Sequence, residues 1–144
     1  MKIRNGFVSN SSSSSFLVYV GRAANKKLRL GDTDQYLTYT EFYDMLNCAN
    51  RGGWSGDTDY RELNWSEVLD HYDPSKAWDP EAYHRALVRA REVDMDQDDD
   101  SYDWLQVDIS YHLPALLTML RAMHEEGIVT VVYDEEERVV KNED

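Results

Sequence analysis

Cysteine and long apolar runs are both scarce in this sequence of 144 residues. The single cysteine, Cys48, excludes an internal disulfide framework and a zinc site built from several cysteines. Because Cys48 falls within a helical pattern, we expect its thiol to be buried and unreactive. No apolar run approaches the roughly 20 residues of a membrane-spanning helix, and Lys2 and Arg4 lead into serines instead of the apolar centre of a secretory leader. We therefore expect a cytoplasmic protein with no membrane partner.

Basic residues are few beyond the first part of the chain. There are 15 lysines and arginines against 28 aspartates and glutamates, a formal net charge of −13. Residues 1–31 hold six of the bases and no acid, which gives +6, whereas the remainder, with nine bases and 28 acids, carries −19. A body this acidic repels the phosphates of nucleic acids. We therefore expect no direct nucleic-acid binding by the body and a basic protein surface as its partner.

The hydrophobic periodicity predicts helices and strands within one domain that spans residues 1–144. Helices are predicted at 38–50, 65–72 and 113–126, and a further one begins at Asp79 and Pro80, which suit the N-cap and the first helical position. Strands are predicted at 16–20, 27–30, 105–109, 128–133 and 138–141. The expected fold is α+β, or a small α/β fold: three to four helices on a small mixed β-sheet, with a C-terminal strand-helix-strand unit. Residues 1–15 would form a basic, serine-rich N-terminal arm.

An acidic run at residues 94–103 has part of the spacing of a calcium-binding loop. Positions 1, 3, 5 and 7 of such a loop would be aspartates (Asp94, Asp96, Asp98, Asp100). However, position 6 is Asp99 instead of glycine and position 12 is Leu105 instead of glutamate, so the turn residue and the bidentate ligand are missing. The four histidines are scattered and none forms a paired metal-ligand motif. We therefore expect a solvated acidic loop, with no metal ion and no cofactor.

The first sixteen residues, MKIRNGFVSNSSSSSF, lead into a short hydrophobic strand. This segment resembles the opening of uncharacterised small proteins of bacteria and large bacteriophages. The resemblance covers 16 of the 144 residues, implies a phage or bacterial accessory protein, and assigns no catalytic residue. Its hydroxyl-rich strip (Ser11, Ser12, Ser13, Ser14, Ser15) could satisfy backbone groups, accept phosphoryl groups or donate hydrogen bonds to an anion.

The leading functional hypothesis is a non-enzymatic protein that binds a basic partner. Aromatic side chains beside acids are suited to such an interface, because tyrosine and tryptophan anchor interfaces and acids speed association with a basic surface. The predicted partner-binding residues are Asp96, Asp98, Asp99, Asp100, Tyr102, Asp103 and Trp104. A nucleic-acid mimic that inhibits a DNA- or RNA-binding protein is one alternative. The other is an enzyme whose site is assembled from dispersed histidines, aspartates and glutamates, which a deep pocket holding such residues would favour.

Overall fold

The fold is α+β, as the sequence predicts, in a computed structural model that describes residues 13–21, 27–29, 32–52 and 58–135. The strands are β1 (Ser13–Tyr19), β2 (Lys27–Arg29), β3 (Tyr36–Thr38), β4 (Asp59–Leu63), β5 (Trp104–Ser110) and β6 (Thr130–Asp134). The helices are α1 (Tyr39–Gly52), α2 (Trp65–His71), α3 (Pro80–Val93) and α4 (Pro114–Glu125), with a short 3-10 helix η3 (Pro74–Lys76). Within the described ranges, no helix has both the length and the apolar character needed to cross a lipid bilayer.

The main sheet has four strands in the order β4-β5-β1-β6, and β2 pairs with β3 in a separate hairpin. Each neighbouring pair in the described main sheet is antiparallel, so the expectation of a mixed sheet is wrong. The elements β5, α4 and β6 follow one another along the chain, but β5 and β6 do not pair, because β1 lies between them. The two inner strands are thus β5 and β1, and β1 is the first strand along the described part of the chain.

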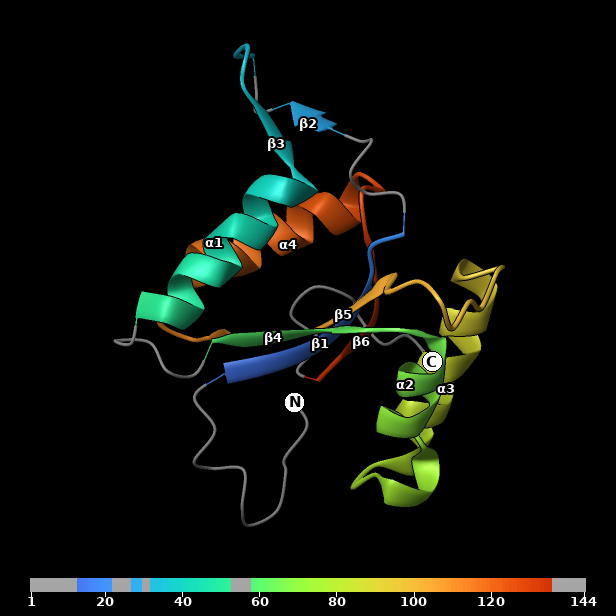
Figure 1. Ribbon diagram of the computed structural model, residues 1–144. Helices are drawn as coiled ribbons and strands as arrows, with labels where there is room; N and C mark the ends of the chain where they lie inside the picture. The colour runs from blue at the N-terminus through green and yellow to red at the C-terminus, as the bar shows by residue number, and fades with distance from the viewer. Residues whose placement is uncertain (1–12, 22–26, 30–31, 53–57, 136–144) are drawn as a thin grey trace.

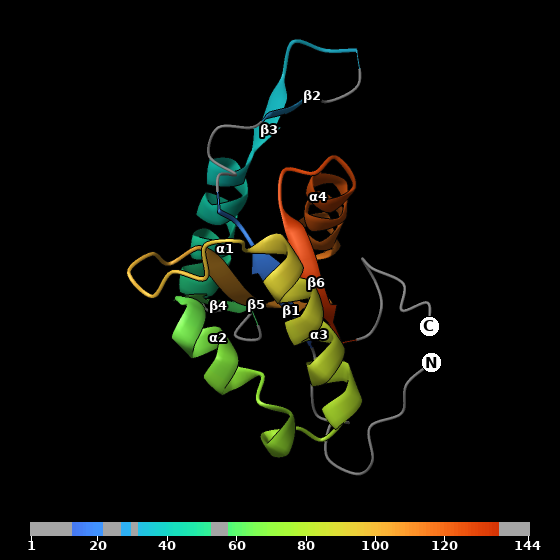
Figure 2. The same ribbon diagram turned by 90° about the vertical axis from the view of Figure 1, so that its right-hand side faces the viewer.

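Helices cover both faces of the main sheet, as Figures 1 and 2 show. Phe16 and Val18 of β1 pack into an apolar cluster with α1 and α4, whereas Leu17 packs on the opposite face with α2 and α3. This division follows from the alternation of side chains along a strand. A register shift between Leu17 and Val18 in the pairing with β6 places Val132 and Tyr133 on the same face, as a β-bulge does. The β2–β3 hairpin projects away from both layers beyond α1 (Figure 1).

Local capping hydrogen bonds mark where α1 and α3 begin. The backbone N–H of Thr38 donates to Glu41 Oε1 (2.9 Å) and the N–H of Glu41 donates to Thr38 Oγ1 (3.2 Å), which forms the predicted capping box of α1. The Asp79 carboxylate accepts from the N–H of Ala82 at the start of α3, as predicted. After α4, Gly127 has φ +76°, a conformation that glycine adopts without steric cost.

Two further expectations differ from the structure. Cys48 is exposed on α1, so the expectation of a buried thiol is wrong. The N-terminal arm was expected to end at residue 15, but Ser13, Ser14 and Ser15 belong to β1 and pair with β5. The rest of the arm, including Ser11 and Ser12, and the strand predicted at 138–141 lie outside the described residues.

Candidate interaction site: the acidic loop between α3 and β5

Residues 94–103, which we call the acidic loop, join the end of α3 to the start of β5. In Figure 2 this segment projects from the body of the molecule. Five contacts, described below, tie it to the core, to α2 and to β1. The loop therefore combines an exposed surface with a defined backbone, and this combination makes it the candidate site.

The first contact is buried at the base of the loop. The carboxylate of Asp94, only 1% exposed, accepts a hydrogen bond from the indole Nε1 of Trp104 at 2.8 Å. It also accepts one from the backbone N–H of Gln97 at 3.0 Å. Gln97 has φ +48°, in the left-handed region that costs a residue with a Cβ roughly 1–2 kcal/mol. The Asp94 carboxylate therefore links the start of the loop to Trp104, the residue that follows the loop, and stabilises the left-handed backbone conformation of Gln97.

The middle of the loop is bound to the start of α2. Asp99 Oδ1 accepts from the backbone N–H of Ser66 at 2.9 Å, and the Asp99 carbonyl accepts from Asn64 Nδ2 at 3.1 Å. Asn64 is itself the N-cap of α2, in a capping box with Glu67. One aspartate of the loop thus satisfies an amide that the first turn of a helix leaves without an intrahelical partner.

The end of the loop is fixed to β1 and by a turn of its own. The carbonyl of Asp103 accepts from the backbone N–H groups of Val20 (2.8 Å) and Gly21 (3.2 Å). Within the loop, Asp98 Oδ1 accepts from the N–H of Asp100 at 2.8 Å. A loop held at its base, middle and end loses little conformational freedom when it binds, which favours affinity.

The outer surface of the loop combines acids with apolar side chains. Asp96, Asp99 and Asp100 are exposed, and among the described residues no lysine or arginine is within ion-pair distance of them. Met95 is 81% exposed and Tyr102 is 55% exposed. Uncompensated negative charge beside exposed methionine and tyrosine suits a basic protein surface with an apolar centre.

The structure divides the predicted partner-binding residues into two groups. Asp96, Asp98, Asp99, Asp100, Tyr102 and Asp103 are exposed or partly exposed within one loop. Trp104 is completely buried and contacts the rings of Tyr19 and Trp65, so it is a core residue and the prediction that it contacts a partner is wrong. The alternation that predicts this strand places Trp104 on the same face as the polar Gln106 and Asp108, so the pattern gave no signal that its side chain is buried. Met95 was missed, because a methionine between aspartates has no distinguishing pattern.

The aspartates at calcium-loop spacing do not converge. Asp94 points inward to Trp104, and Asp98 accepts hydrogen bonds from Asp100 and Ser101 within its own turn. Across the described ranges, no group of three histidine, cysteine or acidic side chains is placed to hold a metal ion. The expectation of a solvated loop without a metal ion stays a prediction.

The serine strip contributes to a polar network on the α2/α3 face of the sheet. Ser15 Oγ donates to Asp108 Oδ1 at 2.6 Å, and Tyr72 donates from its hydroxyl group to Gln106 on the same strand as Asp108. Burial raises the pKa of Asp108, while the hydrogen bond from Ser15 opposes that rise. The rings of Tyr72, Tyr83 and Tyr133 contact one another with centroids 4.9–5.4 Å apart. Rings this close leave no room for a ligand between them.

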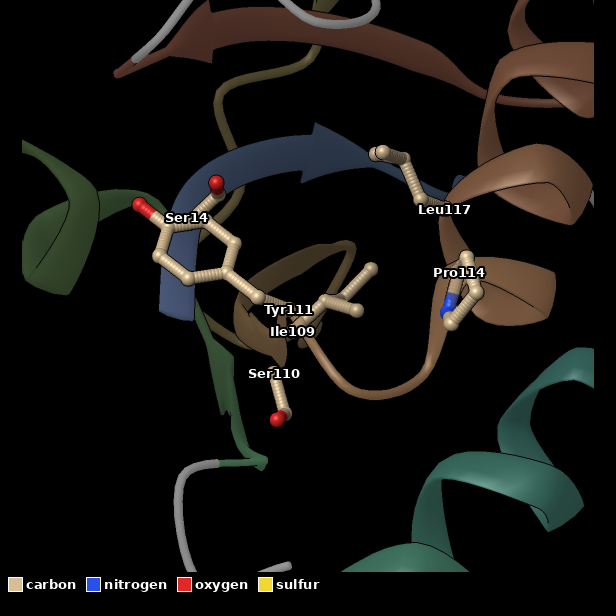
Figure 3. A pocket seen from close by; sticks show the side chains of 6 residues that line it. All are labelled: Ser14, Ile109, Ser110, Tyr111, Pro114 and Leu117. Carbon is tan, nitrogen blue, oxygen red and sulfur yellow. The ribbon is translucent and has the colours of Figure 1, made fainter. Parts of the chain in front are cut away.

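Two pockets differ in size. The one in Figure 3, between Ser14 and Tyr111 on one side and Pro114 and Leu117 on the other, has a volume of about 20 Å³ and suits a water molecule. The second, between the ends of β1 and α3 and the start of β6, has a volume of about 230 Å³. Neither is lined by a histidine or a carboxylate. The arrangement that the enzyme alternative requires is therefore not found in either pocket.

No known protein family, no curated protein and no solved structure matches this chain.

Proposed function

We propose that this protein is a non-enzymatic interaction protein whose acidic loop binds a basic surface of a protein partner. The observation that carries the proposal is a loop that exposes Asp96, Asp99 and Asp100 while buried and capping hydrogen bonds hold its backbone in one conformation. Acids placed in this way attract a basic partner over distance and require little ordering at the moment of contact.

The setting proposed for this activity is the cytoplasm of a bacterial host cell. The N-terminal resemblance supports a bacteriophage accessory protein that binds a host factor or an assembly partner. The charge of −19 after residue 31 supports a basic partner. The absence of a membrane-spanning helix from the described ranges is compatible with this setting.

The first experiment compares captured proteins between variants. In the loop variant Asp96, Asp98, Asp99 and Asp100 are each replaced by asparagine, which keeps an oxygen for the capping hydrogen bonds. A matched control removes four exposed acids elsewhere, with the substitutions Asp44→Asn, Glu62→Gln, Asp70→Asn and Glu81→Gln. Immobilised wild type, loop variant and control are exposed to bacterial lysate, and bound proteins are quantified by mass spectrometry. We expect a basic protein that the wild type and the control retain and the loop variant loses.

The second experiment measures association kinetics with that captured protein. Exposed charges are screened over about 8 Å at physiological ionic strength, so the association rate should fall as salt is raised. The loop variant should associate more slowly than the control, although both carry the same net charge. Equal rates for the two variants at every salt concentration would contradict a role for the loop.

A further inference from the structure

The larger pocket lies where several elements end. Its lining comes from Tyr19 and Val20 at the end of β1, from Val93 at the end of α3, and from residues 127–130, which lead from α4 into β6. Figure 2 shows α3 packed beside β6 in this region. The volume of about 230 Å³ is far larger than a single water molecule needs, so the pocket has room for a small ligand.

The buried residues of this lining present their backbone to the pocket. The side chains of Ile128 and Val129 are only 4% and 2% exposed and pack in the apolar cluster with α1 and α4. Of the lining residues, only Tyr19 and Thr130 have polar side chains, yet more of the pocket surface is polar than apolar. Main-chain atoms therefore supply much of the polar surface.

The backbone of this lining offers acceptors and few donors. The N–H groups of Ile128 and Val129 both donate to the carbonyl of Met123, at 2.9 and 3.4 Å, and the N–H of Val20 donates to the carbonyl of Asp103 at 2.8 Å. Within the described ranges, no hydrogen bond is made to the carbonyls of Ile128 and Val129. A ligand that donates hydrogen bonds therefore suits this pocket better than one that accepts them.

The charges around the pocket favour a cation. Val93 is the last residue of α3, and Gly127 directly follows the C-cap of α4. The C-terminal end of a helix carries partial negative charge, because its last carbonyls lack intrahelical partners. The acidic residues Glu125 and Glu126 precede Gly127, whereas Arg89, one helical turn before Val93, is basic. The balance of these charges is negative.

We propose that this pocket binds a primary ammonium group on an alkyl chain, the chemistry shared by a lysine side chain and a free alkylamine. An ammonium group donates hydrogen bonds and accepts none, which matches a lining of carbonyls with the hydroxyl of Thr130. A divalent metal ion would lack the carboxylate ligands that it prefers, since no acid lines the pocket. The inference goes beyond the proposed function, because it does not require the acidic loop to bind a partner.

Small-molecule probes test the requirement for a charged donor. The full chain is titrated at neutral pH and constant ionic strength with n-butylammonium, tetramethylammonium or n-butanol, and amide chemical shifts are recorded. Tetramethylammonium keeps the charge but has no N–H donor, and butanol is a neutral molecule of similar shape. We expect butylammonium to shift the amides of Ile128, Val129 and Thr130. It should bind about tenfold more tightly than either of the others, because they lose a charged hydrogen bond.

A further probe distinguishes the two sources of the ammonium group. Nα-acetyl-lysine N-methylamide carries the same group on a lysine side chain attached to a peptide backbone. Shifts of the same amides with this probe would identify a lysine of a protein as a ligand that fits. Shifts with butylammonium alone would identify a free amine instead. Either result supports an ammonium site.

Variants provide the second arm of the test. Thr130→Val removes the hydroxyl group with little change in shape and should weaken butylammonium binding about tenfold. Thr118→Val makes the same change at an exposed position of α4 outside the pocket and should leave the affinity unchanged. Val93→Phe fills the pocket from α3 and should abolish binding, so the test does not depend on the folding of a single variant.

The results that would overturn the inference are specific to the pocket. Butanol or tetramethylammonium binding as tightly as butylammonium would remove the requirement for a charged donor. Full affinity in Val93→Phe would place the amine elsewhere on the protein. If none of the probes shifts these amides, the pocket holds only solvent. Each of these results overturns the ammonium site and leaves the proposed function to be decided by the capture experiment.

Discussion

Replacing Asp94 by alanine tests the contact at the base of the acidic loop. In the folded protein this side chain accepts from Trp104 Nε1 at 2.8 Å and from the N–H of Gln97 at 3.0 Å, and it is 1% exposed. Hydrogen bonds to charged groups contribute about 1.5–3 kcal/mol each, and an unsatisfied buried donor costs about 1–3 kcal/mol. Because the indole N–H would remain buried without its acceptor, we expect Asp94→Ala to lower the free energy of unfolding by about 3–5 kcal/mol.

The conservative variant should have a smaller effect. Asp94→Asn keeps one side-chain oxygen but presents an NH₂ group to the second of the two donors, so about half of the loss is expected, roughly 1.5–3 kcal/mol. Asp96→Ala, at an exposed position in the same loop, serves as the control and should change stability by no more than about 0.5 kcal/mol.

Urea denaturation followed by far-ultraviolet circular dichroism measures these free energies without depending on tryptophan fluorescence. A double-mutant cycle with Trp104→Phe isolates the contact between the two side chains, and we expect a coupling of about 1.5–3 kcal/mol. Hydrogen exchange gives a local readout, because the amide of Gln97 should lose protection in Asp94→Ala. If Asp94→Ala changes stability no more than Asp96→Ala does, the buried hydrogen bonds do not hold the loop and the reasoning is refuted.

Three further predictions concern the sheet and α4. Burial raises the pKa of Asp108 above 3.8 in the folded state, so the charged carboxylate disfavours folding. Asp108→Asn keeps an oxygen for the hydrogen bond from Ser15 and should therefore stabilise the protein at neutral pH. Urea midpoints should show that this gain in stability shrinks as the pH falls toward 3.8. Burial lowers the pKa of His124 below 6.5, and the neutral ring accepts a hydrogen bond at Nδ1 from the N–H of Val131. The stability of the folded protein should therefore decline as the pH falls below 6.5. His124→Asn should make this decline smaller in the same series of urea midpoints. Leu120 is fully buried on α4, so Leu120→Ala should cost about 2–5 kcal/mol, and an unchanged urea midpoint would contradict its place in the core.

The sequence was most informative where the signal is local. The capping box of Thr38 and Glu41 and the N-cap at Asp79 involve residues only three positions apart, so the starts of α1 and α3 could be predicted. Strand β4 was missed, because Asp59–Leu63 is an edge strand whose charged residues obscure any alternation.

Long-range pairing was not predictable from local patterns. The serines of β1 have little strand propensity, yet Ser15 pairs with Asp108, 93 residues later, and is held there by that partner. The candidate site shows the same limit. The position of Asp99 in the loop followed from the acidic run, but its hydrogen bond to Ser66 depends on how α2 packs beside the loop.

The position of β1 inside the sheet, between β5 and β6, has a consequence for synthesis. The strand leaves the ribosome before either of its neighbours, and its contact between Ser15 and Asp108 spans 93 residues. At roughly 5–20 residues per second, the apolar stretch Phe16, Leu17 and Val18 is exposed for about 5–20 s before β5 exists to pair with it. The sheet therefore cannot assemble progressively as the chain emerges. The serines that precede this stretch dilute its apolar character, which lowers the risk of aggregation during the delay.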